Sequence, residues 1–125
     1  MKDTFSVIRP FWIFKHPISG FSHLTGAALS FLGLIMLAYP AVVQQSSLRL
    51  TAAFIFGSSM MLLYFSSSLY HLLSLSEKAT RRLRKLDHAM IYVFIAGSYT
   101  PVCLLLLDAK KSWLILGCVW SFALL

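Results

Sequence analysis

The chain has 125 residues, of which 58% are hydrophobic and 12% charged, and its formal net charge is +7. Soluble domains are about a quarter charged, so 11 basic and 4 acidic side chains are too few to cover a soluble surface. The apolar and aromatic content excludes a disordered chain, and two cysteines exclude a disulfide-stapled secreted domain. An integral membrane protein remains, in which the positive charge signals topology and no nucleic-acid partner is expected.

Residues 1–19 mix cations with aromatic side chains, and we expect them to form a cytoplasmic or interfacial segment. The transmembrane bundle then fills residues 20–125, with apolar runs at about 20–43, 50–75, 87–107 and 113–125. About 20 apolar residues span a bilayer core as a helix, so the fourth run, with 13 residues, is incomplete. The sequence predicts an all-α, multipass transmembrane helix bundle, and the short last run indicates a fragment or a truncated gene product.

Polar connections separate these runs, and their charges predict the orientation. The N-terminal segment holds 3 Lys or Arg residues and the basic stretch 76–86, predicted as a loop, holds 5. The turns at 44–49 and 108–111 hold 1 and 2. Because the side richer in cations is cytoplasmic, we expect a cell-membrane protein with its N-terminus and the 76–86 loop in the cytoplasm.

Four polar residues lie near the expected cytoplasmic ends of the apolar runs. His23 lies early in the first run, His71 lies near the end of the second, and Asp87 and His88 open the third. Polar side chains inside a membrane cost free energy unless they have a partner, so such positions indicate a functional site.

Ser67 and His71 are four residues apart and share one helix face. The pair suits a metal ligand or proton carrier with a hydroxyl beside it, since imidazole is a common zinc ligand; the alternative is a histidine hydrogen-bonded for packing. Asp87 could simply cap its helix, but at the depth of His71 it also suits a metal or a metal-bound water. Cys103 and Cys118 lie in apolar runs and are expected to be buried thiols.

Four sequence blocks between about Pro17 and Cys103 resemble the hemolysin III family of multipass membrane proteins, which belongs with the progestin and adiponectin receptors. Each block alone is a weak signal. The four together are specific for the family, because they occur in its order with the basic stretch 76–86 between the second and the third. The blocks are Ile18–Gly26, Ser67-x-x-x-His71, Leu86–Tyr92 and Ile95–Pro101. The resemblance implies the N-terminal part of a seven-helix bundle, with the N-terminus in the cytoplasm and a zinc site near the cytoplasmic face. Ser19, where receptor-type relatives carry Asn, places the chain with the bacterial branch.

The resemblance also implies roles for the polar residues. His71 would bind zinc directly, and Asp87 would act through a metal-bound water. The family's other zinc ligands come from a His-x-x-x-His motif on the last helix, which this sequence does not contain, so the ligand set is incomplete. His23 and His88 are alternative ligands that could join His71.

Two functions follow from the resemblance, and they leave open whether the protein is an enzyme. The first is a hemolysin III-like membrane protein of channel, cytolysis or receptor type that carries zinc. The alternative is a zinc-dependent membrane amide hydrolase acting on a lipid, as ceramidases do. In that case Asp87 would take a proton from the zinc-bound water and Ser67 would steady the oxyanion. The expected partners are the lipid bilayer and a lipid ligand or substrate.

Overall fold

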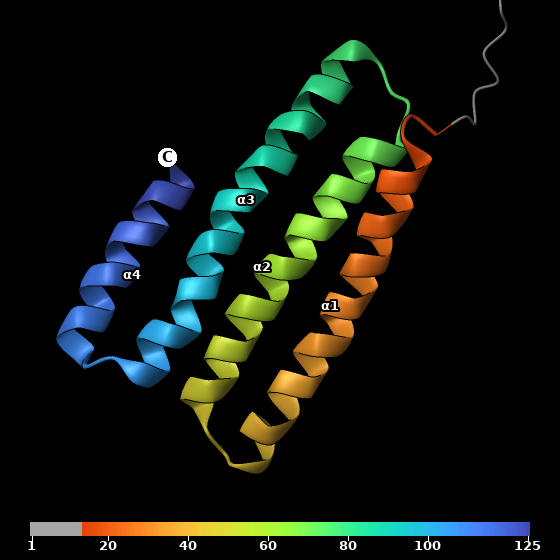
Figure 1. Ribbon diagram of the computed structural model, residues 1–125. Coiled ribbons are helices and arrows are strands. Elements are labelled where there is room, and N and C mark those ends of the chain that lie inside the picture. Colours follow the sequence, from red (N-terminus) through yellow and green to blue (C-terminus); the bar gives the residue numbers. More distant parts are fainter. Residues whose placement is uncertain (1–13) are drawn as a thin grey trace, which may run out of the picture.

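The computed structural model describes residues 14–125, and every regular element in that range is an α-helix, which confirms the predicted all-α class (Figure 1). The helices are α1 (Pro17–Val43), α2 (Ser47–Leu72), α3 (Glu77–Leu106) and α4 (Ala109–Leu124). They run alternately up and down, and each packs against its neighbour in the chain: α1 on α2, α2 on α3 and α3 on α4. The connections are short, so consecutive helices are held as antiparallel neighbours.

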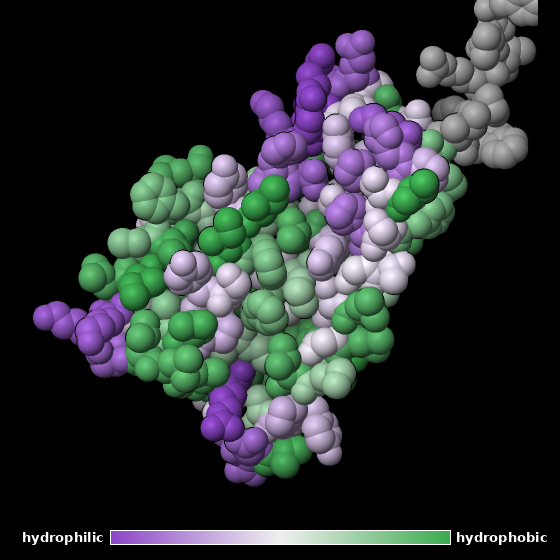
Figure 2. Space-filling model, viewed as in Figure 1, coloured by the Kyte–Doolittle hydropathy of each residue, from purple (hydrophilic) through white to green (hydrophobic). Residues whose placement is uncertain are grey.

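Three of the described helices, α1, α2 and α3, are long and apolar enough to cross a membrane. Only 22% of the most apolar window of each is buried within the described chain, so most of their large apolar side chains face outward. Figure 2 shows the same division, with hydrophilic groups gathered at the ends and hydrophobic groups between them. Helix α4 has 16 residues and is shorter than the other three. The lipid bilayer is therefore the medium that these surfaces fit.

Small residues set how closely the helices approach. Gly97 of α3 lies against Ser59 of α2, and Gly57 of α2 lies against Leu34 of α1. Membrane helices associate through such contacts because lipid provides no hydrophobic drive for association.

Buried hydroxyl groups join α3 to α4. Ser112 donates a hydrogen bond to the Cys103 carbonyl at 2.8 Å, and the Trp120 indole donates to the Thr100 hydroxyl at 3.2 Å. Cys103 is buried as expected, whereas Cys118 is exposed. The expectation of a buried thiol at Cys118 is therefore wrong, because that side of α4 has no packed neighbour within residues 14–125.

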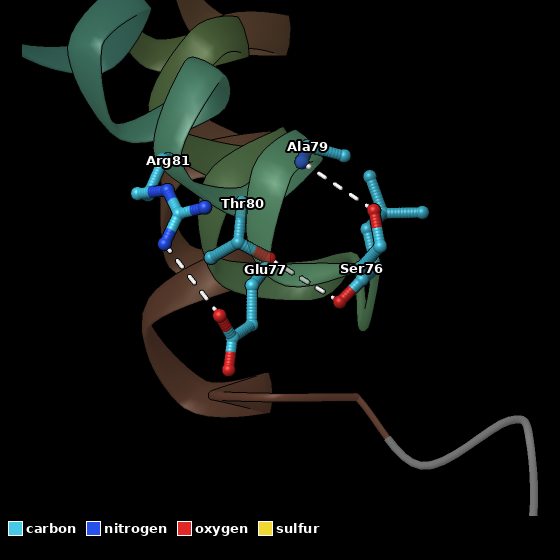
Figure 3. A network of polar contacts seen from close by, with 6 residues as sticks. Ser76, Glu77, Ala79, Thr80 and Arg81 are labelled. Carbon is cyan, nitrogen blue, oxygen red and sulfur yellow. Dashed lines mark hydrogen bonds and ion pairs between the residues drawn. The ribbon is translucent and has the colours of Figure 1, made fainter.

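The basic stretch is helical from Glu77 onward, so the prediction of 76–86 as a loop is wrong. Ser76 caps α3 by accepting a hydrogen bond from the Ala79 amide at 3.5 Å, and Glu77 pairs with Arg81 one turn later at 3.5 Å (Figure 3). An acidic residue in the first turn and a serine cap both stabilise a helix start. Lys and Arg are themselves good helix formers, so a high charge alone did not indicate a loop.

This longer helix also moves two candidate residues away from a helix end. Asp87 and His88 do not open α3, because the helix begins at Glu77 and they lie about three turns inside it. Capping of a helix N-terminus, the structural role considered for Asp87, is thereby excluded.

Candidate metal site at the basic end

The candidate site lies where α1 begins and α2 ends, beside the first half of α3. We call this the basic end of the helix bundle, because the cation-rich first turns of α3 extend from it. His71 is the second-to-last residue of α2 and lies at the centre of the site.

Backbone and hydroxyl contacts fix the start of α1 against the end of α2. The His16 amide donates a hydrogen bond to the His71 carbonyl at 2.9 Å. The buried Ser68 hydroxyl donates to the Gly20 carbonyl at 3.0 Å. Leu72 occupies the space that a Cβ at Gly20 would need, so this close approach requires glycine.

Three imidazole rings gather at this junction. The His23 ring stacks on the His71 ring with centroids 5.7 Å apart and planes 10° from parallel. The His16 ring meets the His71 ring edge to face, also with centroids 5.7 Å apart. Sequence reasoning missed His16, although its spacing of seven residues from His23, two helical turns, was a usable signal.

The Nδ1 atom of His71 is buried and has no hydrogen-bond partner within the described residues. Buried polar atoms are almost always satisfied, and an unsatisfied one costs about 1–3 kcal/mol. The hydroxyl of Ser68, three residues earlier, is committed to Gly20 and does not supply that partner. A buried Nδ1 atom without a hydrogen-bond partner disfavours the role of a histidine hydrogen-bonded for packing. It suits the role of a metal ligand.

Asp87 of α3 is half-buried and lies within electrostatic range of His71. Ser67 of α2 is buried one turn before His71. The structure therefore brings a carboxylate and a hydroxyl to the neighbourhood of the imidazole cluster. Imidazole nitrogen and carboxylate oxygen are zinc ligands, and a nearby hydroxyl can orient such a ligand or its water by a hydrogen bond.

His88 takes no part in this cluster. Its Nδ1 atom lies 2.7 Å from the Arg84 carbonyl, and its side chain lines a groove shared with α4. In residues 14–125, no three His, Cys, Asp or Glu side chains are grouped closely enough to hold a metal ion. The alternative ligand set of His23, His71 and His88 is therefore not assembled.

The fold and the site define a class: a multispan α-helical membrane protein with polar and imidazole side chains at one end of its helices. The haemolysin-III related family model matches residues 11–125, and the chain belongs to this family. It is 38% identical over 115 residues to the hemolysin-3 homolog of Bacillus subtilis (strain 168), covering 91% of this chain and 53% of that protein. It is 36% identical over 103 residues to hemolysin-3 of Bacillus cereus, covering 82% of this chain and 47% of that protein.

The chain thus spans about half the length of these curated relatives. No solved structure matches the chain.

Proposed function

We propose that this protein is a zinc-binding, membrane-permeabilising member of the haemolysin-III related family, with its metal site at the basic end. The observation that carries the zinc site is the buried, unpartnered Nδ1 atom of His71. His71 would hold zinc directly and Asp87 through a water molecule. Zinc bound there would tie α2 to α3 at the junction that the His16 backbone already fixes to α1.

The permeabilising activity is proposed from the relatives, two of which carry the name hemolysin-3. The surface of the helix bundle fits that proposal, since most of its large apolar side chains are exposed and can face lipid or further helices. We further propose that the basic end faces the cytoplasm, because the first turns of α3 carry five of the 11 Lys and Arg residues.

A vesicle experiment tests the proposal. The protein is reconstituted into liposomes that hold a self-quenched dye, and release is measured with zinc, with a chelator, and for His71→Ala. Leu62→Ala is the control, since Leu62 lies on α2 and is half exposed away from the site. We expect dye release with zinc and with Leu62→Ala, and a large loss with the chelator or with His71→Ala. No release from the unaltered protein would refute the permeabilising activity, and undiminished release from His71→Ala would refute the role of zinc.

A second function, hydrolysis of a lipid amide, is favoured by one observation. An apolar cavity of about 570 Å³ lies between α1, α2 and α3, a volume typical of small-molecule sites. Its polar lining residues are Gln44, Arg49 and Ser98. Ala53, which lines the cavity, lies about 27 Å from His71 along α2, at about 1.5 Å per residue. The cavity could therefore hold an acyl tail but not the reacting group.

Substitution of Ser67 separates the two functions experimentally. Hydrolysis would need Asp87 to take a proton and Ser67 to donate to an oxyanion, whereas dye release needs neither step. Bound zinc would supply an activated water for such chemistry. Fluorescent ceramide is the substrate, and Ser67→Ala is the variant, because Ser67 is not a proposed zinc ligand. Hydrolysis lost in Ser67→Ala with dye release retained would establish the second function, and absence of hydrolysis in the unaltered protein would exclude it.

A further inference from the structure

Two residues that precede α1, Lys15 and His16, lie against the last turn of α2, at the junction where Figure 1 shows the start of α1 beside the end of α2. Each contacts one of two successive residues of α2: Lys15 contacts Tyr70, and His16 contacts His71. Neither belongs to a helix, because α1 begins at Pro17. We call Lys15 and His16 the strap.

The backbone of His16 joins the two helices. Its amide donates a hydrogen bond to the His71 carbonyl at 2.9 Å, and its carbonyl accepts one from the Gly20 amide at 2.9 Å. The last carbonyl groups of a helix have no partner within that helix, so the strap supplies a hydrogen bond that the end of α2 lacks. The His16 side chain makes no capping hydrogen bond to α1, and its ring packs on His71 instead.

Side-chain contacts hold the strap at two further points. The Lys15 Nζ atom lies 4.3 Å from the centre of the Tyr70 ring, a distance typical of a cation–π contact. The rings of His16 and His71 meet edge to face, which is a favoured geometry for aromatic pairs. The Tyr70 ring in turn meets the His71 ring, with centroids 5.0 Å apart. Both strap residues are therefore coupled to His71, one directly and one through Tyr70.

The His71 Nδ1 atom is buried by the residues that the structure describes. Further chain packed at this end would add to that cover and would not remove it. A metal ion from solution reaches a buried nitrogen only when a neighbouring group moves. Three rings contact the His71 ring, those of His16, His23 and Tyr70, and of these only the ring of His16 lies outside a helix. Displacing the strap breaks fewer contacts than unwinding a helix end, so local opening should occur there first.

We propose that the strap controls the exchange of the metal ion at His71. Zinc enters and leaves when Lys15 and His16 release the end of α2, and it is retained while they are closed. This inference rests on the proposed zinc site and adds its regulation. Because the strap supplies no ligand to the ion, it opens equally readily with the ion bound or absent. Loosening the strap therefore speeds binding and release by the same factor and leaves the affinity nearly unchanged.

Zinc release from the purified protein into excess chelator, followed by stopped flow, tests the proposal, and a competition titration gives the affinity. His16→Ala removes the ring, whereas His16→Phe keeps an aromatic ring that cannot bind metal. Lys15→Met removes the cation, whereas Lys15→Arg keeps it. Ile18→Ala is the control, since Ile18 lies in the first turn of α1 and is 87% exposed. Circular dichroism compares the helix content of all variants.

We expect His16→Ala and Lys15→Met each to speed zinc release about three- to tenfold, and Lys15→Met/His16→Ala about ten- to thirtyfold. The release rates of His16→Phe, Lys15→Arg and Ile18→Ala should stay within about twofold of the unaltered protein, and the affinity of every variant within about threefold.

Two results would overturn the strap. Affinity lost equally in His16→Ala and His16→Phe would make His16 a ligand, and bound zinc with equal release rates in all variants would show that the strap does not limit exchange. Absence of zinc from the unaltered protein would instead refute the metal site on which the strap depends, and the zinc content distinguishes this outcome from the other two.

Discussion

The imidazole ring of His23 lies parallel to that of His71, with the centroids 5.7 Å apart and the planes 10° from parallel. These residues come from different helices, and their stacking depends on the contacts that hold the start of α1 to the end of α2. The Nδ1 atom of His71 is buried and has no hydrogen-bond partner within residues 14–125. We therefore expect His23 to position His71 while His71 binds the metal.

His71 should be the strongest determinant of zinc binding. Replacing it with alanine removes the only buried side-chain polar atom of residues 14–125 that lacks a partner. We expect His71→Ala to abolish bound zinc and Asp87→Ala to weaken binding by roughly 10–100-fold, as the loss of an indirect ligand does. Metal analysis after purification at fixed free zinc measures this. Cys118→Ala, which removes an exposed thiol elsewhere, is the control, and full zinc content in His71→Ala would contradict the assignment.

The basic end should face the cytoplasm. Single cysteines replace Ser74, in the α2–α3 connection, or Ser47, at the start of α2, in a protein whose Cys103 and Cys118 are replaced by serine. Both serines are exposed and lie at opposite ends of α2. In intact cells an impermeant maleimide should label the cysteine at 47 and not the cysteine at 74. The reverse pattern would invert the topology.

Gly97 should tolerate no side chain. A Cβ at this position would lie 2.7 Å from the Ser59 Cβ, closer than side chains pack. We expect Gly97→Ala to lower the free energy of unfolding by about 1–3 kcal/mol, as overpacking does, measured by unfolding in mixed micelles. Adding Ser59→Gly should restore part of the loss. Gly33→Ala is the control, since a Cβ there meets nothing within 4 Å, and an equal loss at both glycines would argue against a specific contact.

Asp108 should make the first turn of α4 sensitive to acid. Hydrogen bonds from the Lys111 side chain and backbone hold the pKa of Asp108 below its usual value of 3.8. Because the pKa is depressed in the folded state, the stabilisation is complete above the usual value and is lost as the pH falls through the folded value.

Hydrogen exchange at the Lys111 amide, which donates to the Asp108 carboxylate at 3.1 Å, measures this between about pH 5 and about pH 2. Protection should fall with pH in the unaltered protein. It should change much less in Asp108→Asn, because asparagine also caps helices but does not titrate. The same fall in both proteins would assign the effect to another group.

Hydropathy and chain length were enough to predict an all-α membrane protein with three long apolar helices and a shorter fourth, because the bilayer admits few other structures. Ser76 caps α3 and Glu77 lies in its first turn, and the prediction of a loop at 76–86 overlooked both local signals. That error placed Asp87 at a helix end, although it lies well inside α3.

Tertiary structure alone decided which candidates meet. His16, His23 and His71 come together because Ser68 and the His16 amide draw α1 onto α2, a contact between segments distant in the chain. Asp87 and His88 are adjacent in sequence, yet successive residues on a helix point about 100° apart. Asp87 lies within electrostatic range of His71, whereas His88 lines the groove beside α4. Composition and spacing determined how deep in the membrane these side chains lie. The rotation of α3 about its axis, set by packing against its neighbours, decided which site each of them joins.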